Sequence, residues 1–216
     1  GVTMKTDDLI RLLASDTVAV ESRVWRPRYA LALAAGVIGA VLPMFAMLGV
    51  RSDIAVVAQI PAFWVKFAFP GALAAGVLLV AIRLSRPGVP LGLAPWAIPV
   101  PVLAIWLLGV IELAGATPEQ REVLFWGTTW ATCPVYVALL SVPSFIALLW
   151  VMKTLAPTRL ALAGAMAGLL AGTVGAATYA LYCPESGASF LGVWYVIGML
   201  IPTALGAAIG PRVLRW

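Results

Sequence analysis

Six long apolar segments run through the sequence, and a fold outside a membrane cannot bury all of them. They are Tyr29–Val50, Ala62–Ile82, Leu91–Ala114, Trp130–Met152, Leu160–Tyr182 and Phe190–Ile209. A helix needs about 20 mostly apolar residues to cross about 30 Å of hydrocarbon, and each segment is that long. The chain is 62% hydrophobic and 11% charged, whereas soluble domains are about 45–50% apolar and about 25% charged. The sequence therefore predicts an all-α polytopic membrane protein with six transmembrane helices.

Lysine and arginine are distributed unevenly between the two sides of the predicted bundle. Eleven of the 14 lie in the N-terminal segment, the second and fourth links and the C-terminus. The other three (Arg51, Lys66 and Arg121) share the opposite side with most of the acidic residues. Because cytoplasmic loops carry the excess of Lys and Arg, both termini are expected in the cytoplasm of a bacterial inner membrane. Lys66 and Glu112 then lie near the outer surface, where we expect them to act as interfacial anchors.

The composition argues against most enzymatic and transport chemistry. The chain has no histidine, which is the commonest general base and metal ligand. Its two cysteines cannot form a four-thiolate zinc site. No carboxylate falls near the middle of a predicted span, where proton-coupled transporters usually carry one. We therefore expect no enzyme and no bound cofactor.

The polar region at residues 1–28 is predicted to be a cytoplasmic segment separate from the transmembrane domain at 29–216. Thr6 is a suitable N-cap for a short helix, whose apolar face carries Leu9, Leu12 and Leu13, with Ile10 at its flank. A helix this short is marginally stable alone, so we expect it to dock. The membrane surface, the cytoplasmic end of the bundle and a soluble partner protein are all candidates.

Gly164, Gly168 and Gly172 recur every four residues in the fifth span. Small residues at this spacing allow two helix backbones to approach closely in a membrane. Packing within the bundle is therefore the preferred interpretation, with a substrate path along the groove as the alternative.

Cys133 begins the fourth predicted span and Cys183 ends the fifth, so both are expected at a matching depth near the outer face. On the oxidising side of a bacterial membrane two thiols can form a disulfide. They could also capture a soft metal ion as thiolates, with Glu185 as an accessory oxygen ligand. A third possibility is a purely structural pair. The Cys-x-x-Cys spacing typical of thiol oxidoreductases is absent.

Two stretches of the sequence resemble the NrsF-type bacterial membrane anti-sigma factors. One is the run Met-Lys-Thr-Asp-Asp-Leu-Ile-Arg-Leu-Leu-Ala at residues 4–14. The other is Tyr-Ala-Leu-Tyr-Cys-Pro-Glu-Ser-Gly-Ala-Ser-Phe at 179–190, followed by Trp194-Tyr195. The Cys-x-Glu-Ser element, followed by Phe and Trp-Tyr, is the most specific part of the resemblance.

The resemblance implies a regulator that holds an extracytoplasmic-function (ECF) sigma factor at the inner membrane through its cytoplasmic N-terminal segment. On this chain the candidate contacts with the sigma factor are Asp7, Leu9, Ile10, Leu12 and Leu13. Cys133 and Cys183 become the candidate sensor of oxidative or heavy-metal stress. The partners are then the sigma factor and the lipid bilayer, with no direct contact to nucleic acid. A small cysteine-dependent metal or solute transporter is the alternative, followed by a purely structural membrane subunit.

Overall fold

The computed structural model describes residues 25–84, 90, 92–154 and 157–215. Six helical stretches in this part of the chain are long and apolar enough to cross a membrane, as the sequence predicts. They are α2 (Trp25–Met47), α4 (Pro61–Leu84), η1 (Ala94–Ala97) with α5 (Pro99–Gly115), α7 (Cys133–Thr154), α8 (Leu160–Tyr179), and α9 (Ala188–Phe190) with η2 (Leu191–Tyr195) and α10 (Val196–Val213). Of the predicted N-terminal segment at 1–28, residues 1–24 lie outside the described residues, and residues 25–28 form the start of α2.

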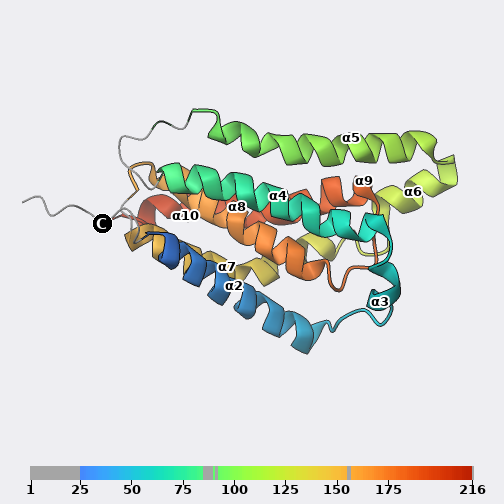
Figure 1. Cartoon of the computed structure of the whole chain (residues 1–216), viewed down its shortest axis with the longest axis horizontal. Coiled ribbons are helices and arrows are strands. Elements are labelled where there is room, and N and C mark those ends of the chain that lie inside the picture. Colours follow the sequence, from blue (N-terminus) through green and yellow to red (C-terminus); the bar gives the residue numbers. More distant parts are fainter. Residues whose placement is uncertain (1–24, 85–89, 91, 155–156, 216) are drawn as a thin grey trace, which may run out of the picture.

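Helix α8 forms the centre of the bundle, and most of its side chains are buried. It packs most extensively against α10 and α7, while α4 and α2 complete its surroundings. Figure 1 shows α5 running along one edge of this group. Most of the apolar side chains of α5 are exposed, so they would face lipid in a membrane. The core therefore consists mainly of α4, α7, α8 and α10.

The glycine stripe of α8 faces α10. A Cβ atom added at Gly164 or Gly168 would collide with the backbone of α10, at Gly206 and Pro202 respectively. At Gly172 it would lie 2.9 Å from the Cα atom of Met199. The close approach of α8 and α10 thus depends on these three positions having no side chain.

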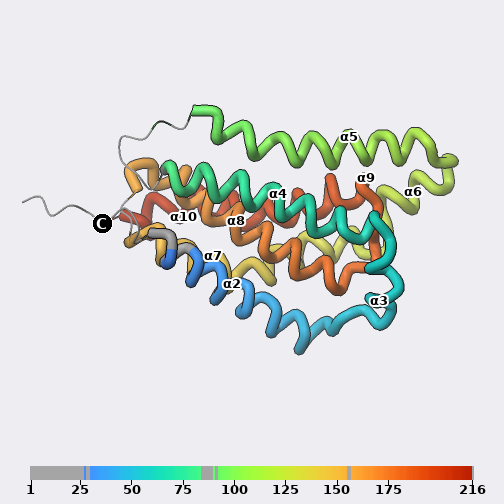
Figure 2. Tube along the Cα trace, in the orientation of Figure 1, coloured from blue at the N-terminus to red at the C-terminus, as the bar shows by residue number. Residues whose placement is uncertain are grey.

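The two ends of the bundle differ in structure. The tube in Figure 2 shows the start of α2 and the ends of α4 and α10 at the same end. At the opposite end two short helices, α3 (Ile54–Val57) and α6 (Pro118–Trp126), lie beside the segment 180–187. We call α3, α6 and residues 180–187, with the loops that join them to the bundle, the cap. Neither α3 nor α6 is predicted as a helix from the sequence.

Helix α6 carries its own local start signal. The side chain of Thr117 accepts a hydrogen bond from the Gln120 amide, and the Gln120 side chain accepts one from the Thr117 amide, which together form a capping box. Gly127, at φ 57°, ends the helix. Turns after Gly127 delay the start of α7 to Cys133, three residues later than the predicted start of this span.

Aromatic packing attaches α6 to the start of the last span. The indole rings of Trp126, Trp130 and Trp194 have centroids 5.1–5.5 Å apart. The Trp194 indole nitrogen also donates to the Phe125 carbonyl oxygen at 2.9 Å. These contacts fix the 127–132 turns, which lead into α7, against the segment that follows Cys183.

Candidate functional site

The two cysteines lie at the cap end of one continuous buried cluster. Cys133 and Cys183 have unbonded thiols and no exposed surface. Thr129 connects them: its carbonyl oxygen accepts from the Cys133 amide at 2.8 Å, and its hydroxyl oxygen lies 3.9 Å from the Cys183 sulfur. The fold therefore brings together two thiols that are 50 residues apart in the sequence.

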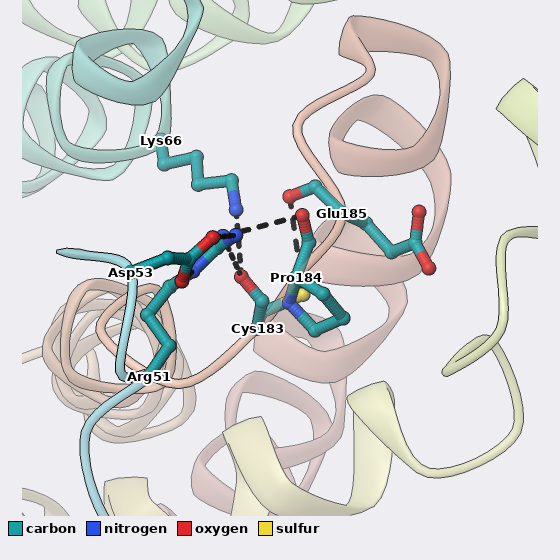
Figure 3. Close-up of polar contacts among 6 residues, drawn as sticks. All are labelled: Arg51, Asp53, Lys66, Cys183, Pro184 and Glu185. Carbon is teal, nitrogen blue, oxygen red and sulfur yellow. Dashed lines mark hydrogen bonds and ion pairs between the residues drawn. The ribbon is translucent and has the colours of Figure 1, made fainter. Parts of the chain in front are cut away.

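Cys183 lies in the irregular segment between α8 and α9. Its backbone is hydrogen-bonded by Lys66 of α4 and by Arg51 of the loop that follows α2. Its amide still donates to the Tyr179 carbonyl oxygen at 2.9 Å, but Pro184 has no amide hydrogen with which to continue the helix. The Cys183 carbonyl oxygen accepts from Lys66 Nζ at 2.8 Å and from an Arg51 guanidinium nitrogen at 3.3 Å. Figure 3 shows both cations converging on the Cys183–Pro184 segment.

The burial of Lys66 overturns its expected role as an interfacial anchor. Its side chain has no exposed surface, because the segment containing Cys183 folds over the first turns of α4. Glu112 is not a simple anchor either: its carboxylate accepts from the Ser189 amide at 3.0 Å and the Ser189 hydroxyl at 3.1 Å. Lys66 instead joins α4 to the cap, and Glu112 joins α5 to α9.

Arg51 and Asp53 form a two-point ion pair at the edge of the cap. The Arg51 nitrogens Nε and Nη2 lie 2.6 and 2.7 Å from the two Asp53 carboxylate oxygens. Hydrogen bonding to this guanidinium lowers the pKa of Asp53 below its ordinary value, and the same hydrogen bond raises the pKa of Arg51. Arg51 also donates to the Pro184 carbonyl oxygen at 3.3 Å, so the pair orients a contact to the cysteine segment.

The lowered pKa of Asp53 predicts a loss of stability in acid. The ion pair contributes fully above the unfolded-state pKa of about 3.9 and is lost as the pH falls through the lower folded-state value. Asp53→Asn should therefore lower the melting temperature slightly at pH 7, and this difference from the wild type should shrink as the pH falls below about 4 and vanish below the folded-state pKa of Asp53. Thermal unfolding of both proteins in detergent across this pH range tests the prediction. A difference that stays constant with pH would contradict it.

The Glu185 side chain points away from Lys66 and Arg51 and binds Thr128, which lies in the turns before α7. Its Oε1 atom accepts from the amide and the hydroxyl of Thr128, each at 2.8 Å. The turn at Gly127 permits this contact, since a Cβ atom there would lie 2.7 Å from the Glu185 carboxyl carbon. Among the described residues, no group of three or more Cys, Asp or Glu side chains is arranged to hold a metal ion.

Two tyrosines complete the surroundings of the cysteines. Tyr179 of α8 and Tyr195 of η2 are fully buried, with ring centroids 5.9 Å apart. Neither hydroxyl has a hydrogen-bond partner within the described part of the chain. Both sulfurs are close enough to interact electrostatically with both phenol groups. Tyr195 lies in a turn of π-helix, a rare form that is frequent at functional sites.

Four residues around the cysteines are not predicted as site residues from the sequence: Lys66, Arg51, Tyr179 and Tyr195. For Lys66 a signal was present, because an ionisable side chain inside an apolar span is by default a functional candidate. The proposed sigma-factor contacts Asp7, Leu9, Ile10, Leu12 and Leu13 lie outside the described residues.

Comparisons with known proteins cover nearly the whole chain. The model of a family described as "NrsF: Negative regulator of sigma F" matches residues 13–216. The chain is 51% identical over 213 residues to the "Probable anti-sigma-F factor NrsF" of Azospira oryzae, covering 99% of this chain and all of that protein. It is 35% identical over 215 residues to the "Anti-sigma-F factor NrsF" of Caulobacter vibrioides, again over 99% of this chain and all of the relative. No solved structure matches it. On the strength of this end-to-end similarity, the chain belongs to the NrsF family.

Proposed function

We propose that this protein is an anti-sigma factor of the bacterial inner membrane that binds an ECF sigma factor in the cytoplasm. The observation that carries the proposal is its end-to-end identity of 51% and 35% to two proteins named as anti-sigma-F factors. The six apolar helices provide the membrane anchor. The end of the bundle that carries Arg83, Lys153 and Arg212 in the last turns of its helices then faces the cytoplasm, and the cap faces the periplasm.

The sigma factor is held by the segment at residues 1–28. This is the longest polar region of the chain, and α2, which contains its last residues, begins at the positively charged end of the bundle. An amphipathic helix that presents Leu9 and Leu13 on one face suits a hydrophobic groove on a soluble partner. A sigma factor bound there is kept from RNA polymerase.

The cysteine pair is the sensor, and its oxidation releases the sigma factor. An azo oxidant such as diamide accepts the two electrons and two protons that Cys133 and Cys183 lose, so that one S–S bond forms and the azo group becomes a hydrazine. Two thiols with no third metal ligand among the described residues suit a disulfide better than a metal centre. A disulfide here would join the start of α7 to the end of α8.

Release requires that the oxidised and reduced bundles differ in energy. Moving a two-state equilibrium from 1:99 to 99:1 takes about 5.5 kcal/mol, and a disulfide forced away from its preferred geometry stores several kcal/mol. A disulfide that fits only one arrangement of α7 and α8 therefore supplies energy of the required order. Because α8 contacts α7, α10, α4 and α2, a shift of α8 would move these helices at the cytoplasmic end as well. The N-terminal segment joins α2 at that end.

Co-purification from the native membrane tests both parts of this function. Tagged wild-type protein should retain a sigma factor in stoichiometric amount, and diamide should remove most of it. A Cys133→Ser/Cys183→Ser variant should retain the sigma factor after the same treatment, since no disulfide can form. A parallel sample treated with cadmium tests whether a metal ion also releases the sigma factor.

The outcomes separate the two parts. Absence of any sigma factor from the untreated wild-type protein would refute the anti-sigma role. Equal release from the wild type and the double variant would refute the sensor role and leave capture intact.

A further inference from the structure

We propose that Lys66, together with the hydroxyls of Tyr179 and Tyr195, stabilises negative charge on the Cys183 sulfur, which makes Cys183 the first sulfur to be oxidised and Cys133 the resolving one. The inference rests on the sensor role proposed above. It gives the two cysteines different roles in the oxidation, and it gives the buried Lys66 a role in stabilising charge. Figure 3 shows Lys66 pointing from α4 toward the Cys183 segment.

Lys66 is a buried cation with unused hydrogen-bonding capacity. An ammonium group has three N–H donors, whereas the contact to the Cys183 carbonyl oxygen is its one hydrogen bond within the described part of the chain. The carboxylate of Asp53 is already paired with Arg51, and that of Glu185 is bound to Thr128. Because an unpaired charge is costly to bury, an anion close by would stabilise the charged form of Lys66.

The two thiols are further acid groups near Lys66 in the described part of the chain, and Cys183 is the residue whose carbonyl oxygen Lys66 binds. Both cysteine sulfurs lie within its electrostatic range. Tyr179 and Tyr195 add two buried hydroxyl donors with no acceptor among the described residues, and the Thr129 hydroxyl lies 3.9 Å from the Cys183 sulfur. The Glu185 carbonyl oxygen lies 4.0 Å from the Cys183 sulfur and accepts from the thiol, whereas a negatively charged sulfur or sulfenate oxygen would instead accept from the tyrosine hydroxyls.

Cys183 is better placed than Cys133 to carry this charge. Lys66 binds its carbonyl oxygen, and it lies in an irregular segment that can move without unwinding a long helix. Cys133 is the first residue of α7, so its backbone belongs to a long helix. The charge and the freedom of movement that a nucleophile needs therefore coincide at Cys183.

The reaction with hydrogen peroxide balances in two steps. The Cys183 sulfur attacks one peroxide oxygen, the O–O bond breaks, and the other oxygen leaves as water with the thiol proton, which leaves a sulfenic acid on Cys183. The Cys133 sulfur then attacks the sulfenic sulfur, the S–O bond breaks, and hydroxide leaves as water with the Cys133 proton. The pair loses two electrons to the peroxide, and one disulfide forms.

The rate of sulfenic acid formation in the purified full-length protein tests the proposal. In a Cys133→Ser background the sulfenic acid of Cys183 cannot be resolved, so dimedone traps it and mass spectrometry measures its rate of appearance. Adding Lys66→Met should slow labelling by about tenfold or more, as expected when a charged hydrogen-bonding partner is lost. Lys66→Arg should restore most of the rate because it keeps the cation.

Arg51→Gln is the matched control. It also removes contacts to the Cys183 and Pro184 carbonyl oxygens, but it removes a cation that Asp53 already neutralises. It should therefore loosen the same segment and leave the rate within a few-fold of the parent. Equal slowing by Arg51→Gln and Lys66→Met would mean that Lys66 acts only as a structural contact, and this would overturn the proposal.

Two further results would also overturn it. One is a Lys66→Met protein that labels as fast as its parent. The other is a Cys183→Ser protein whose Cys133 labels as fast as Cys183 does in the Cys133→Ser parent. If Lys66→Met does not fold, Tyr179→Phe/Tyr195→Phe keeps both rings and should slow labelling several-fold, and an unchanged rate there counts against the proposal. The assay contains no sigma factor, so its failure is distinct from failure of the anti-sigma function.

Discussion

Replacing Leu9 and Leu13 together by Asp is expected to weaken capture of the sigma factor by about 100-fold or more. The two residues lie four apart, so in a helix they occupy one face, and this face is the one proposed to enter the sigma factor. Burying a leucine side chain contributes about 1.5–3 kcal/mol, and each 1.4 kcal/mol changes an affinity tenfold. Losing two such contacts and placing two carboxylates against an apolar groove gives an effect of this size.

The affinity of purified full-length protein for its sigma factor, measured by biolayer interferometry in detergent, gives the comparison. The control variant is Arg11→Asp/Ser15→Asp, which places two aspartates at the same spacing on a different face of the segment. It should bind within a few-fold of the wild type. If Leu9→Asp/Leu13→Asp bound as tightly as this control, the assigned contact face would be wrong.

The transmembrane helices could be predicted closely from the sequence because length and apolarity alone decide which segments cross a membrane. The second span shows this: the prediction is Ala62–Ile82 and the helix is Pro61–Leu84. Helix α6 could not be predicted by length and apolarity, since it is short and polar. Its start signal, Thr117 with Pro118 and Gln120, is local and becomes visible only when links are examined as carefully as spans.

The cysteine site was predictable in part. Depth along two consecutive spans places Cys133 and Cys183 at the same end, and the structure has both in one buried cluster. Depth says nothing about which way a side chain faces, so Lys66 was expected at the membrane surface and lies instead beneath the segment of Cys183. The position of Tyr195 depends on a π-helical turn, which a pattern of 3.6 residues per turn cannot reveal.

The interface between α8 and α10 is expected to tolerate no side chain at Gly168. A Cβ atom there would overlap the Pro202 carbonyl oxygen and lie 2.8 Å from the Cα atom of Thr203, and backbone atoms cannot move aside as a side-chain tip can. Overpacking of this kind costs about 1–3 kcal/mol or more. Because the interface with α10 is the most extensive that α8 makes, Gly168→Ala should lower the melting temperature of the detergent-solubilised protein by about 5 °C or more.

Gly71 of α4 provides the matched control for this prediction. It also lies within a membrane-spanning helix, but a Cβ atom added there would have no neighbour within 4 Å. Alanine replaces the same hydrogen and has the higher helix propensity, so Gly71→Ala should leave the melting temperature unchanged or slightly raised. Equal melting temperatures for Gly168→Ala and Gly71→Ala would show that α8 and α10 do not pack this closely in the membrane. The route proposed from the cysteines through α8 to the N-terminal segment would then lose its structural basis, since it needs α8 to move together with its neighbours.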